Sequence, residues 1–211
     1  MRFVYLHGFA SSPRSGKAVA FQSALADSGI SLEVPALDEG DFEHLTVSGQ
    51  LAVLGRLLHN EPVCLIGSSM GGYLAALYAA SHPEVARLVL LALAFGFASH
   101  WQSQWQGNTW LEVFHHGDRT PRRIHYGLIE DALQYPPVPD FTQPAVIFHG
   151  IHDEVVPVEN SRAFVAAHPN ARLAELDSDH ELLDVLERIV TESLAFLKVG
   201  YDHTESMKWQ L

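Results

Sequence analysis

Residues 63–78 read VCLIGSSMGGYLAALY, a short apolar run that leads through small residues into a longer apolar segment. The run Val63–Ile66 is typical of a strand that is buried on both faces. The apolar residues after it recur at helical spacing: Met70, Tyr73, Leu74, Leu77 and Tyr78. Pro83 then ends the helix, because the residue before a proline disfavours helical geometry. The stretch therefore predicts a strand, a tight turn at Ser69 and a helix.

Ser69 lies at the centre of a Gly-x-Ser-x-Gly pattern, with Gly67 and Gly71 two residues to either side. In this pattern the serine occupies a strained strand-to-helix turn, and the glycines let the strand and the helix approach each other. A serine hydroxyl becomes an effective nucleophile when a base takes its proton. We therefore expect Ser69 to be a nucleophile. The alternative is a serine that only caps the following helix.

The rest of the chain repeats this alternation of apolar runs and amphipathic segments. Five further runs are candidate strands: Phe3–Leu6, Leu32–Val34, Leu88–Leu91, Ala145–Phe148 and Arg172–Leu176. Two further segments carry apolar residues on one helical face: Val47, Leu51, Leu54 and Leu58 in the first, and Leu182, Leu186, Ile189, Val190 and Leu197 in the second. This order predicts a doubly wound α/β fold, with a mostly parallel sheet of about six strands and ligands at the carboxyl ends of the strands.

The chain length and composition suit one compact domain over residues 1–199, since 47% of the 211 residues are hydrophobic. Residues 95–139 contain no clear strand. We interpret them as a cap inserted into the domain, because so long a connection is usually functional or has helices of its own. Residues 200–211 lose the apolar periodicity and predict a loose C-terminal tail.

Two groups of side chains in the cap are candidates for substrate contacts. Trp101, Trp105 and Trp110 are candidates for a substrate pocket. Trp101 and Trp105 lie four residues apart, so these two could equally form an apolar stripe that packs on the sheet. The cap is also locally basic: His115, His116, Arg119, Arg122, Arg123 and His125. Such a cluster is most simply a solvated face. The sharper hypothesis is that it binds an anionic substrate group, with Arg122 and Arg123 contributing to the affinity.

The charge, the apolar runs and the cysteine content indicate which partners and locations are expected for the protein. Thirteen Lys and Arg against 25 Asp and Glu give a formal net charge of −12, so nucleic acid is an unexpected partner. No apolar run approaches the roughly 18 residues of a membrane span. The apolar start Met1–Leu6 reaches His7 and Gly8 too soon to be a secretory signal. The single cysteine, Cys64, predicts a buried strand thiol and fits a cytoplasmic setting.

Three blocks of the sequence carry a resemblance to known enzymes. They are YLHGFASSPRSGKA at residues 5–18, GSSMGGY at residues 67–73, and Asp153-Glu154-Val155. With these blocks the chain resembles the α/β-hydrolase superfamily and, more narrowly, the small bacterial esterases called YqiA-like. The resemblance implies an α/β-hydrolase fold over most of the chain and hydrolysis of a carboxylic ester.

In that fold a catalytic acid and then a histidine follow the serine along the chain, each in a loop after a late strand. Asp153 follows the predicted strand Ala145–Phe148, and His180 follows the next predicted strand. Glu154 is the competing acid, but the resemblance places the aspartate of Asp-Glu-Val in the role. We expect His180 to take the proton of Ser69 while Asp153 orients the imidazole ring.

The tetrahedral intermediate of acyl transfer carries an oxyanion, which needs two preorganised N–H donors. For this fold one donor is the backbone N–H of the residue after the serine, here Met70. The other comes from the loop after the first central strand, where we assign the backbone N–H of Phe9. His7 and Gly8 would shape that loop.

The expected activity is hydrolysis of a small-molecule ester through an acyl-enzyme on Ser69. An acyl-CoA thioesterase would use the same groups, and a dienelactone-hydrolase-like enzyme is a second alternative, although those typically carry cysteine as nucleophile. A non-catalytic binding protein on the same fold is the third. No cofactor or metal is expected, because His149, His152 and Asp153 lack the His-Glu-x-x-His arrangement. The sequence leaves the oligomeric state open.

Overall fold

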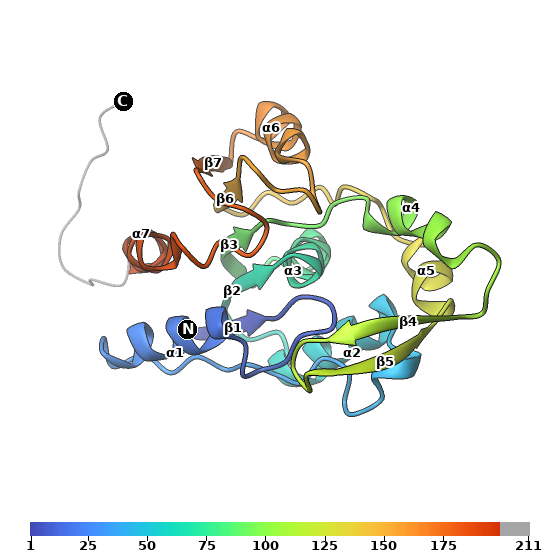
Figure 1. The fold of residues 1–211 in the computed structure, drawn as a ribbon. Helices are drawn as coiled ribbons and strands as arrows, with labels where there is room; N and C mark the ends of the chain where they lie inside the picture. Colours follow the sequence, from blue (N-terminus) through green and yellow to red (C-terminus); the bar gives the residue numbers. More distant parts are fainter. Residues whose placement is uncertain (199–211) are drawn as a thin grey trace.

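The computed structural model describes residues 1–198, so the tail predicted at 200–211 lies outside the described residues. At its centre is a sheet of five parallel strands in the spatial order β1, β2, β3, β6, β7 (Figure 1). These strands are β1 (Arg2–Leu6), β2 (Val63–Ser68), β3 (Val85–Leu91), β6 (Ala145–Gly150) and β7 (Ala171–Leu176). Every residue of β2 and β6 is buried, as expected of parallel strands covered on both faces. Cys64 of β2 is among them, and burial raises the pKa of its thiol to about 11.

Helices cover both faces of the sheet, which confirms the predicted fold class (Figure 1). One face carries α1 (Gly16–Ala26) and α7 (Leu186–Lys198); the other carries α2 (Val47–Leu58), α3 (Met70–Ser81) and α6 (Val158–Ala167). Each face has its own hydrophobic core, because successive strand residues point to opposite sides. In β1, for example, Val4 and Leu6 belong to one core and Tyr5 to the other. No helix within residues 1–198 has the length and apolar character needed to cross a membrane.

The order of the strands determines where a ligand site is expected. After β1 the chain passes through α1 to a single bridge between Val4 and Glu33 on the outer side of β1. It then returns through α2 to β2, on the inner side of β1. The winding therefore reverses at β1, and the carboxyl ends of β1 and β2 form the switch point at which open α/β sheets bind ligands.

The central sheet has five strands rather than about six, because the predicted strand Leu32–Val34 forms only that bridge. The backbone of Glu33 exchanges hydrogen bonds of 2.8 and 2.9 Å with Tyr5 and Phe3. Pro35 follows directly after Val34. Because a proline has no N–H, it cannot donate the next hydrogen bond to β1.

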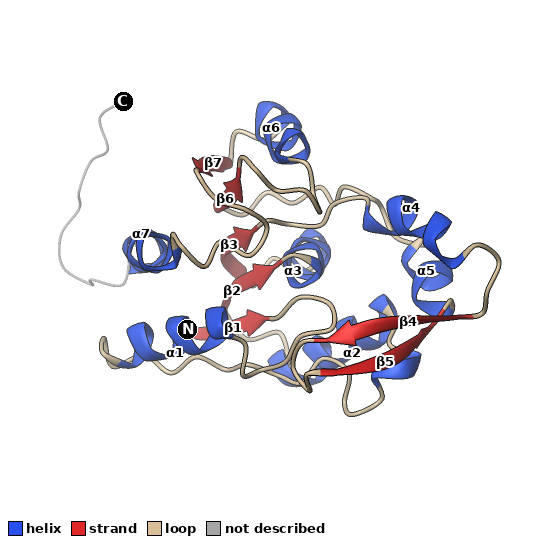
Figure 2. Ribbon diagram, in the orientation of Figure 1, coloured by secondary structure: helices blue, strands red, loops and turns tan. Residues whose placement is uncertain are grey.

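Between β3 and β6 the chain forms a separate group of short elements. They are α4 (Phe97–Trp101), the 3-10 helix η2 (Gln102–Trp105), β4 (Trp110–His115), β5 (Thr120–His125) and α5 (Gly127–Ala132). β4 and β5 pair as an antiparallel hairpin that stands apart from the central sheet (Figure 2). The expectation that residues 95–139 contain no strand is therefore wrong.

Two properties hide this hairpin from sequence patterns. Both strands are largely exposed or half-buried, so neither shows an apolar run or a clean alternation. β5 also contains Pro121, and proline is depleted in strand interiors. A two-stranded hairpin tolerates it, because each strand has one edge without a partner strand.

The turn of the hairpin is attached to the loop that follows β1. His116 donates its backbone N–H to the carbonyl of Ala10 over 2.7 Å. A Cβ on Gly117 would lie 2.7 Å from the Cβ of Ser12, so glycine is what allows this close approach. Below the hairpin, Phe42 of the 3-10 helix η1 (Phe42–His44) packs edge-on against the ring of His115. The hairpin is thereby held over the switch point.

Candidate active site

Ser69 occupies the turn between β2 and α3 in a conformation that few serines adopt. Its φ of +53° lies in the left-handed region, where a side chain is strained. A Cβ on Gly71 would overlap the carbonyl of Leu6, and a Cβ on Gly67 would overlap the backbone of Gly71. Both glycines are therefore required for α3 to begin this close to the sheet. The Ser69 side chain makes no capping hydrogen bond to α3, so the geometry does not favour the capping alternative.

The structure brings Ser69, Asp153 and His180 together from distant parts of the chain. The Oγ of Ser69 lies 3.2 Å from the Nε2 of His180, whose Nδ1 lies 2.8 Å from the Oδ2 of Asp153. A carboxylate only accepts hydrogen bonds, so Nδ1 carries the proton, and Nε2 is left to accept from the Ser69 hydroxyl. Glu154, the competing acid, is exposed, whereas the Asp153 side chain is fully buried beside His180.

The carboxylate of Asp153 is surrounded by hydrogen-bond donors. Its Oδ1 accepts from the backbone N–H groups of Val155 and Val156, at 2.9 and 2.7 Å. Its Oδ2 lies 2.8 Å from His180 Nδ1 and 3.1 Å from His149 Nε2. Burial is the largest single effect and favours the protonated acid. The hydrogen bonds from His149, His180 and Val156 together outweigh it and hold the pKa of Asp153 well below its usual range.

His149 is a partner of Asp153 that sequence reasoning missed. It is completely buried at the end of β6. Its Nε2 lies 2.9 Å from the Val156 carbonyl, which can only accept, so this nitrogen carries a proton. In the neutral ring, Nδ1 accepts from the hydroxyl of Ser161 over 2.7 Å. Its position four residues before Asp153, in the same strand and loop, is the signal that could have revealed it.

The loop after β1 approaches the nucleophile where an oxyanion site is needed. A Cβ on Gly8 would lie 3.5 Å from the Cβ of Ser69, in ordinary contact. The ring of Phe9 packs edge-on against Trp101, with centroids 5.1 Å apart, which holds this loop in place. Met70 is the first residue of α3, where backbone N–H groups have no acceptor within the helix. The N–H groups of Phe9 and Met70 thus remain the candidate oxyanion donors.

Two cavities open from Ser69, and Trp101 and Val155 belong to the walls of both. The first, of about 700 Å³, is termed the apolar cavity and is lined mainly by Phe95, Phe97, Val138, Val156, Ala163 and Phe164. The second, of about 760 Å³, is termed the polar cavity and is lined mainly by Ser11, Ser12, Arg14, Lys17, Arg119 and His180. The nucleophile therefore lies between two spaces of different chemistry.

The three tryptophans predicted as pocket residues lie in three different places in the structure. Trp101 lies in the wall of both cavities at Ser69. Trp105 is buried and lines a separate cavity of about 520 Å³. Trp110 lies in the hairpin, with the guanidinium of Arg123 over its ring at 4.8 Å. The stripe expected from the spacing of Trp101 and Trp105 is interrupted, because α4 ends at Trp101.

The basic residues predicted for the cap also lie in different places. Arg119 and His116 line the polar cavity. Arg122 and Arg123 instead form ion pairs with acidic side chains, at 2.8 and 3.4 Å. An anionic group beside Ser69 would therefore meet Arg119, and not the two arginines that the sequence suggested.

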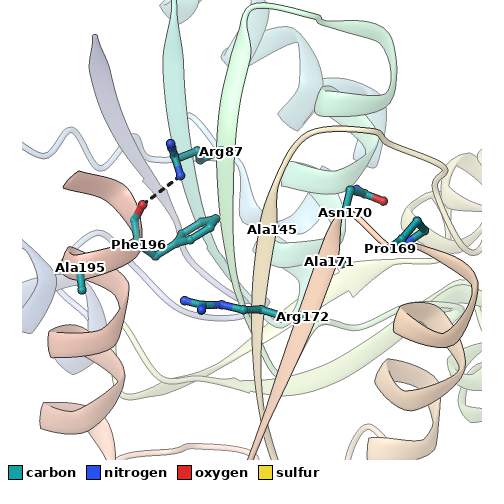
Figure 3. A pocket seen from close by; sticks show the side chains of 8 residues that line it. All are labelled: Arg87, Ala145, Pro169, Asn170, Ala171, Arg172, Ala195 and Phe196. Carbon is teal, nitrogen blue, oxygen red and sulfur yellow. Dashed lines mark hydrogen bonds between the residues drawn. The ribbon is translucent and has the colours of Figure 1, made fainter. Parts of the chain in front are cut away.

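Away from this site, another cavity of about 530 Å³ lies at the amino-terminal ends of β6 and β7, beside α7 (Figure 3). Arg87 donates to the carbonyl of Phe196 over 3.2 Å, and Arg172 lies over the ring of the same residue. The residues that line it lie at the opposite edge of the sheet from Ser69, so it is not part of the candidate site. In the described residues, no group of three or more His, Cys, Asp and Glu is placed to hold a metal ion.

The comparison with protein families gives a match over nearly the whole chain. The model of an uncharacterised protein family, UPF0227, matches residues 2–198. The chain belongs to the UPF0227 family. The resemblance inferred from the three sequence blocks is thereby confirmed. No curated protein matches this chain in sequence.

Solved structures show that this UPF0227 chain has the α/β-hydrolase fold. Alpha/beta hydrolase domain-containing protein 10 from mouse is 20% identical with a TM-score of 0.78, over 93% of this chain and 89% of the mouse chain. Est1E from Butyrivibrio proteoclasticus, in a structure with bound ferulic acid, is 22% identical with a TM-score of 0.76, over 92% and 88%. A monoacylglycerol lipase from Paleococcus ferrophilus is 15% identical with a TM-score of 0.69, over 90% and 93%. Similarity at this level of identity concerns the fold.

Proposed function

We propose that this protein is a serine hydrolase that cleaves carboxylic esters. The observation that carries the proposal is the hydrogen-bonded chain from Ser69 Oγ to His180 Nε2, at 3.2 Å, and from His180 Nδ1 to Asp153, at 2.8 Å. The strained turn at Ser69 supports it, because strain at a nucleophile is maintained only where the surrounding structure requires it.

In the first half of the reaction, the Oγ of Ser69 attacks the acyl carbon while His180 takes the hydroxyl proton. The carbonyl oxygen becomes an oxyanion, which accepts hydrogen bonds from the backbone N–H groups of Phe9 and Met70. When the bond between the acyl carbon and the alcohol oxygen breaks, His180 returns its proton to the departing alcohol. An acyl-enzyme on Ser69 remains.

In the second half, His180 takes a proton from water as the water oxygen attacks the acyl-enzyme. The acid is released when Ser69 recovers its proton from His180. Throughout, ionised Asp153 fixes the ring and stabilises the imidazolium that forms twice in each cycle. The structural neighbour named as a monoacylglycerol lipase is consistent with this chemistry, which a thioester substrate would also use.

A fluorophosphonate probe tests the proposal, because it reacts only with an activated serine nucleophile. We expect stoichiometric labelling of the folded wild-type protein, mapped by mass spectrometry to the peptide that contains Ser69. Ser69→Ala should not be labelled and should lower kcat toward p-nitrophenyl esters by about 10⁴-fold or more. Unfolded wild-type protein is the matched control and should remain unlabelled. Labelling of Ser69→Ala, or none of the folded wild type, would refute the assignment.

A further inference from the structure

The two cavities at Ser69 can be assigned to the two halves of an ester. His180 has to return its proton to the departing alcohol oxygen, so the alcohol part must lie on the side of His180. His180 lines the polar cavity, together with Gly8 and Phe9 of the oxyanion loop. The apolar cavity is lined mainly by aromatic and aliphatic side chains, which suit an acyl chain, with a few polar residues such as Ser99 and Asn160 among them. We therefore assign the apolar cavity to the acid and the polar cavity to the alcohol.

The polar cavity carries positive charge in a protein whose formal net charge is −12. Three basic side chains line it with a single carboxylate, that of Glu181: Arg14, Lys17 and Arg119. Lys17 is already paired with Glu181: its Nζ donates to the backbone carbonyl of Glu181 over 2.9 Å and lies 3.5 Å from the Glu181 carboxylate. Within residues 1–198 the guanidinium groups of Arg14 and Arg119 form no ion pair. Two uncompensated cations thus face the space assigned to the alcohol.

These cations come from two elements that are fixed to each other. Arg119 follows the hairpin turn, whose His116 N–H is hydrogen-bonded to Ala10, and whose Gly117 packs on Ser12. Arg14 lies in the loop between β1 and α1, and its backbone N–H donates to Ser12 Oγ over 3.3 Å. The backbone segments that carry the two arginines are therefore fixed to each other on one side of the polar cavity.

The start of α1 adds to the same field. Ser15 caps this 11-residue helix by accepting from the N–H of Ala18. Gly16 and Lys17, the first two residues of the helix, line the polar cavity. The positive end of a helix dipole favours an anion, and no acidic residue in the first turn of α1 neutralises it. The segment SSPRSGK at residues 11–17, which does not match a phosphate-loop pattern in the sequence, is thus placed where an anionic substrate group would lie.

We infer that the preferred substrate is an ester of an apolar acid with an alcohol that carries an anionic oxygen group, a carboxylate or a phosphate. The inference rests on the proposed hydrolase function and specifies its substrate class. Water supplies the hydroxyl group of the released acid and the proton of the released alcohol, so no further reactant is needed. Arg14 and Arg119 act by binding the anionic group, and the reacting atoms remain those of Ser69 and His180.

Matched esters test this inference. Hexanoyl esters of 3-hydroxybenzoate, 3-hydroxyphenyl phosphate and neutral 3-hydroxybenzamide have aromatic alcohols of similar size. We expect kcat/KM to be about tenfold higher for at least one anionic ester than for the amide, as one charge-assisted contact would give. The preference should arise in KM and weaken as salt rises. Comparing the carboxylate with the phosphate shows which anionic group the cavity selects.

Arginine variants connect the preference to the cavity. Arg14→Gln and Arg119→Gln should each reduce the preference for the anionic ester severalfold, while hydrolysis of the amide ester is retained. Arg122→Gln is the matched control, since it removes the same charge from the same hairpin outside the polar cavity, and it should keep the preference. Melting temperatures close to that of the wild type show that each variant is folded.

The outcomes separate this inference from the function on which it rests. Equal kcat/KM for all three esters, with fluorophosphonate labelling of Ser69 intact, would overturn the substrate class and leave the hydrolase standing. An anionic preference that survives in Arg14→Gln and Arg119→Gln would overturn the role assigned to the two arginines. Failure of both labelling and hydrolysis would overturn the proposed function, and the substrate class with it.

Discussion

Asp153 is the residue on which the polar contacts of the candidate site converge. Two backbone N–H groups fix one of its oxygens, and His149 and His180 lie within 3.1 Å of the other. A carboxylate held in this way has one orientation and one protonation state near neutral pH. The ring of His180 therefore has one tautomer, the one that leaves Nε2 facing Ser69.

Removing the charge of Asp153 while keeping its size should expose this role. In Asp153→Asn, the amide would favour the tautomer of His180 that places a proton on Nε2, and kcat should fall by about 10⁴-fold. Glu154→Gln is the matched control and should stay within about twofold of the wild type, because Glu154 is exposed. Steady-state kinetics with a p-nitrophenyl ester measures both. A large loss in Glu154→Gln with a small one in Asp153→Asn would reverse the assignment of the acid.

At the scale of elements, the turn from β2 through Ser69 to α3 depends on local constraints, which is why it could be predicted from the sequence. The buried strand, the two glycines and the apolar helix all lie within one short segment, and each agrees with the others. The loops that carry Asp153 and His180 could be placed for the same reason, since each follows an apolar strand.

The elements that sequence reasoning missed depend on contacts between distant segments. The hairpin of β4 and β5 is held by the docking of its turn on the loop after β1, which no periodicity reports. Leu32–Val34 has a strand composition, but Pro35 and the edge of the sheet limit it to a bridge. The sequence does not single out His149 as a partner of Asp153, because the burial that makes it one is a property of the folded chain.

The glycine at position 71 offers a test of the element itself. A Cβ there would overlap the carbonyl oxygen of Leu6, which is backbone and cannot move aside cheaply. Gly71→Ala should therefore lower the free energy of unfolding by about 2–3 kcal/mol and abolish labelling of Ser69. Gly55→Ala, in the exposed middle of α2 with no atom close to the added Cβ, should instead stabilise the protein by about 0.8 kcal/mol. Urea unfolding measures both changes, and a neutral Gly71→Ala would contradict the close approach of α3 to β1.

At the scale of the whole molecule, the reversal of winding at β1 brings distant segments to one edge. The candidate site residues follow four of its strands: Phe9 after β1, Ser69 and Met70 after β2, Asp153 after β6 and His180 after β7. The hairpin reaches the same edge from the segment between β3 and β6, so nearly the full length of the described chain contributes to one site.

The ionised Asp153 also links the site to the acid stability of the fold. Its pKa is lowered in the folded protein and is about 3.9 in an unfolded chain. The stabilisation from its charge is therefore fully present above about pH 4 and is lost as the pH falls toward the folded value. Urea unfolding should show that wild type exceeds Asp153→Asn in stability at pH 6 and that this difference shrinks by pH 3. A difference that is constant over this range would contradict the lowered pKa.

Trp101 and Val155 line both cavities together with Ser69, so in the proposed assignment these two side chains contact both the acid and the alcohol of the ester. If the acid and the alcohol occupy the two cavities as proposed, substitutions deeper in either cavity should alter the preference for the acid or for the alcohol alone, since separated sites act additively. For the wild type, kcat/KM measured for every combination of several acids with several alcohols should then be the product of one factor for the acid and one factor for the alcohol. A small residue at position 101 would join the two cavities. The effects of the acid and of the alcohol on kcat/KM would then no longer be independent.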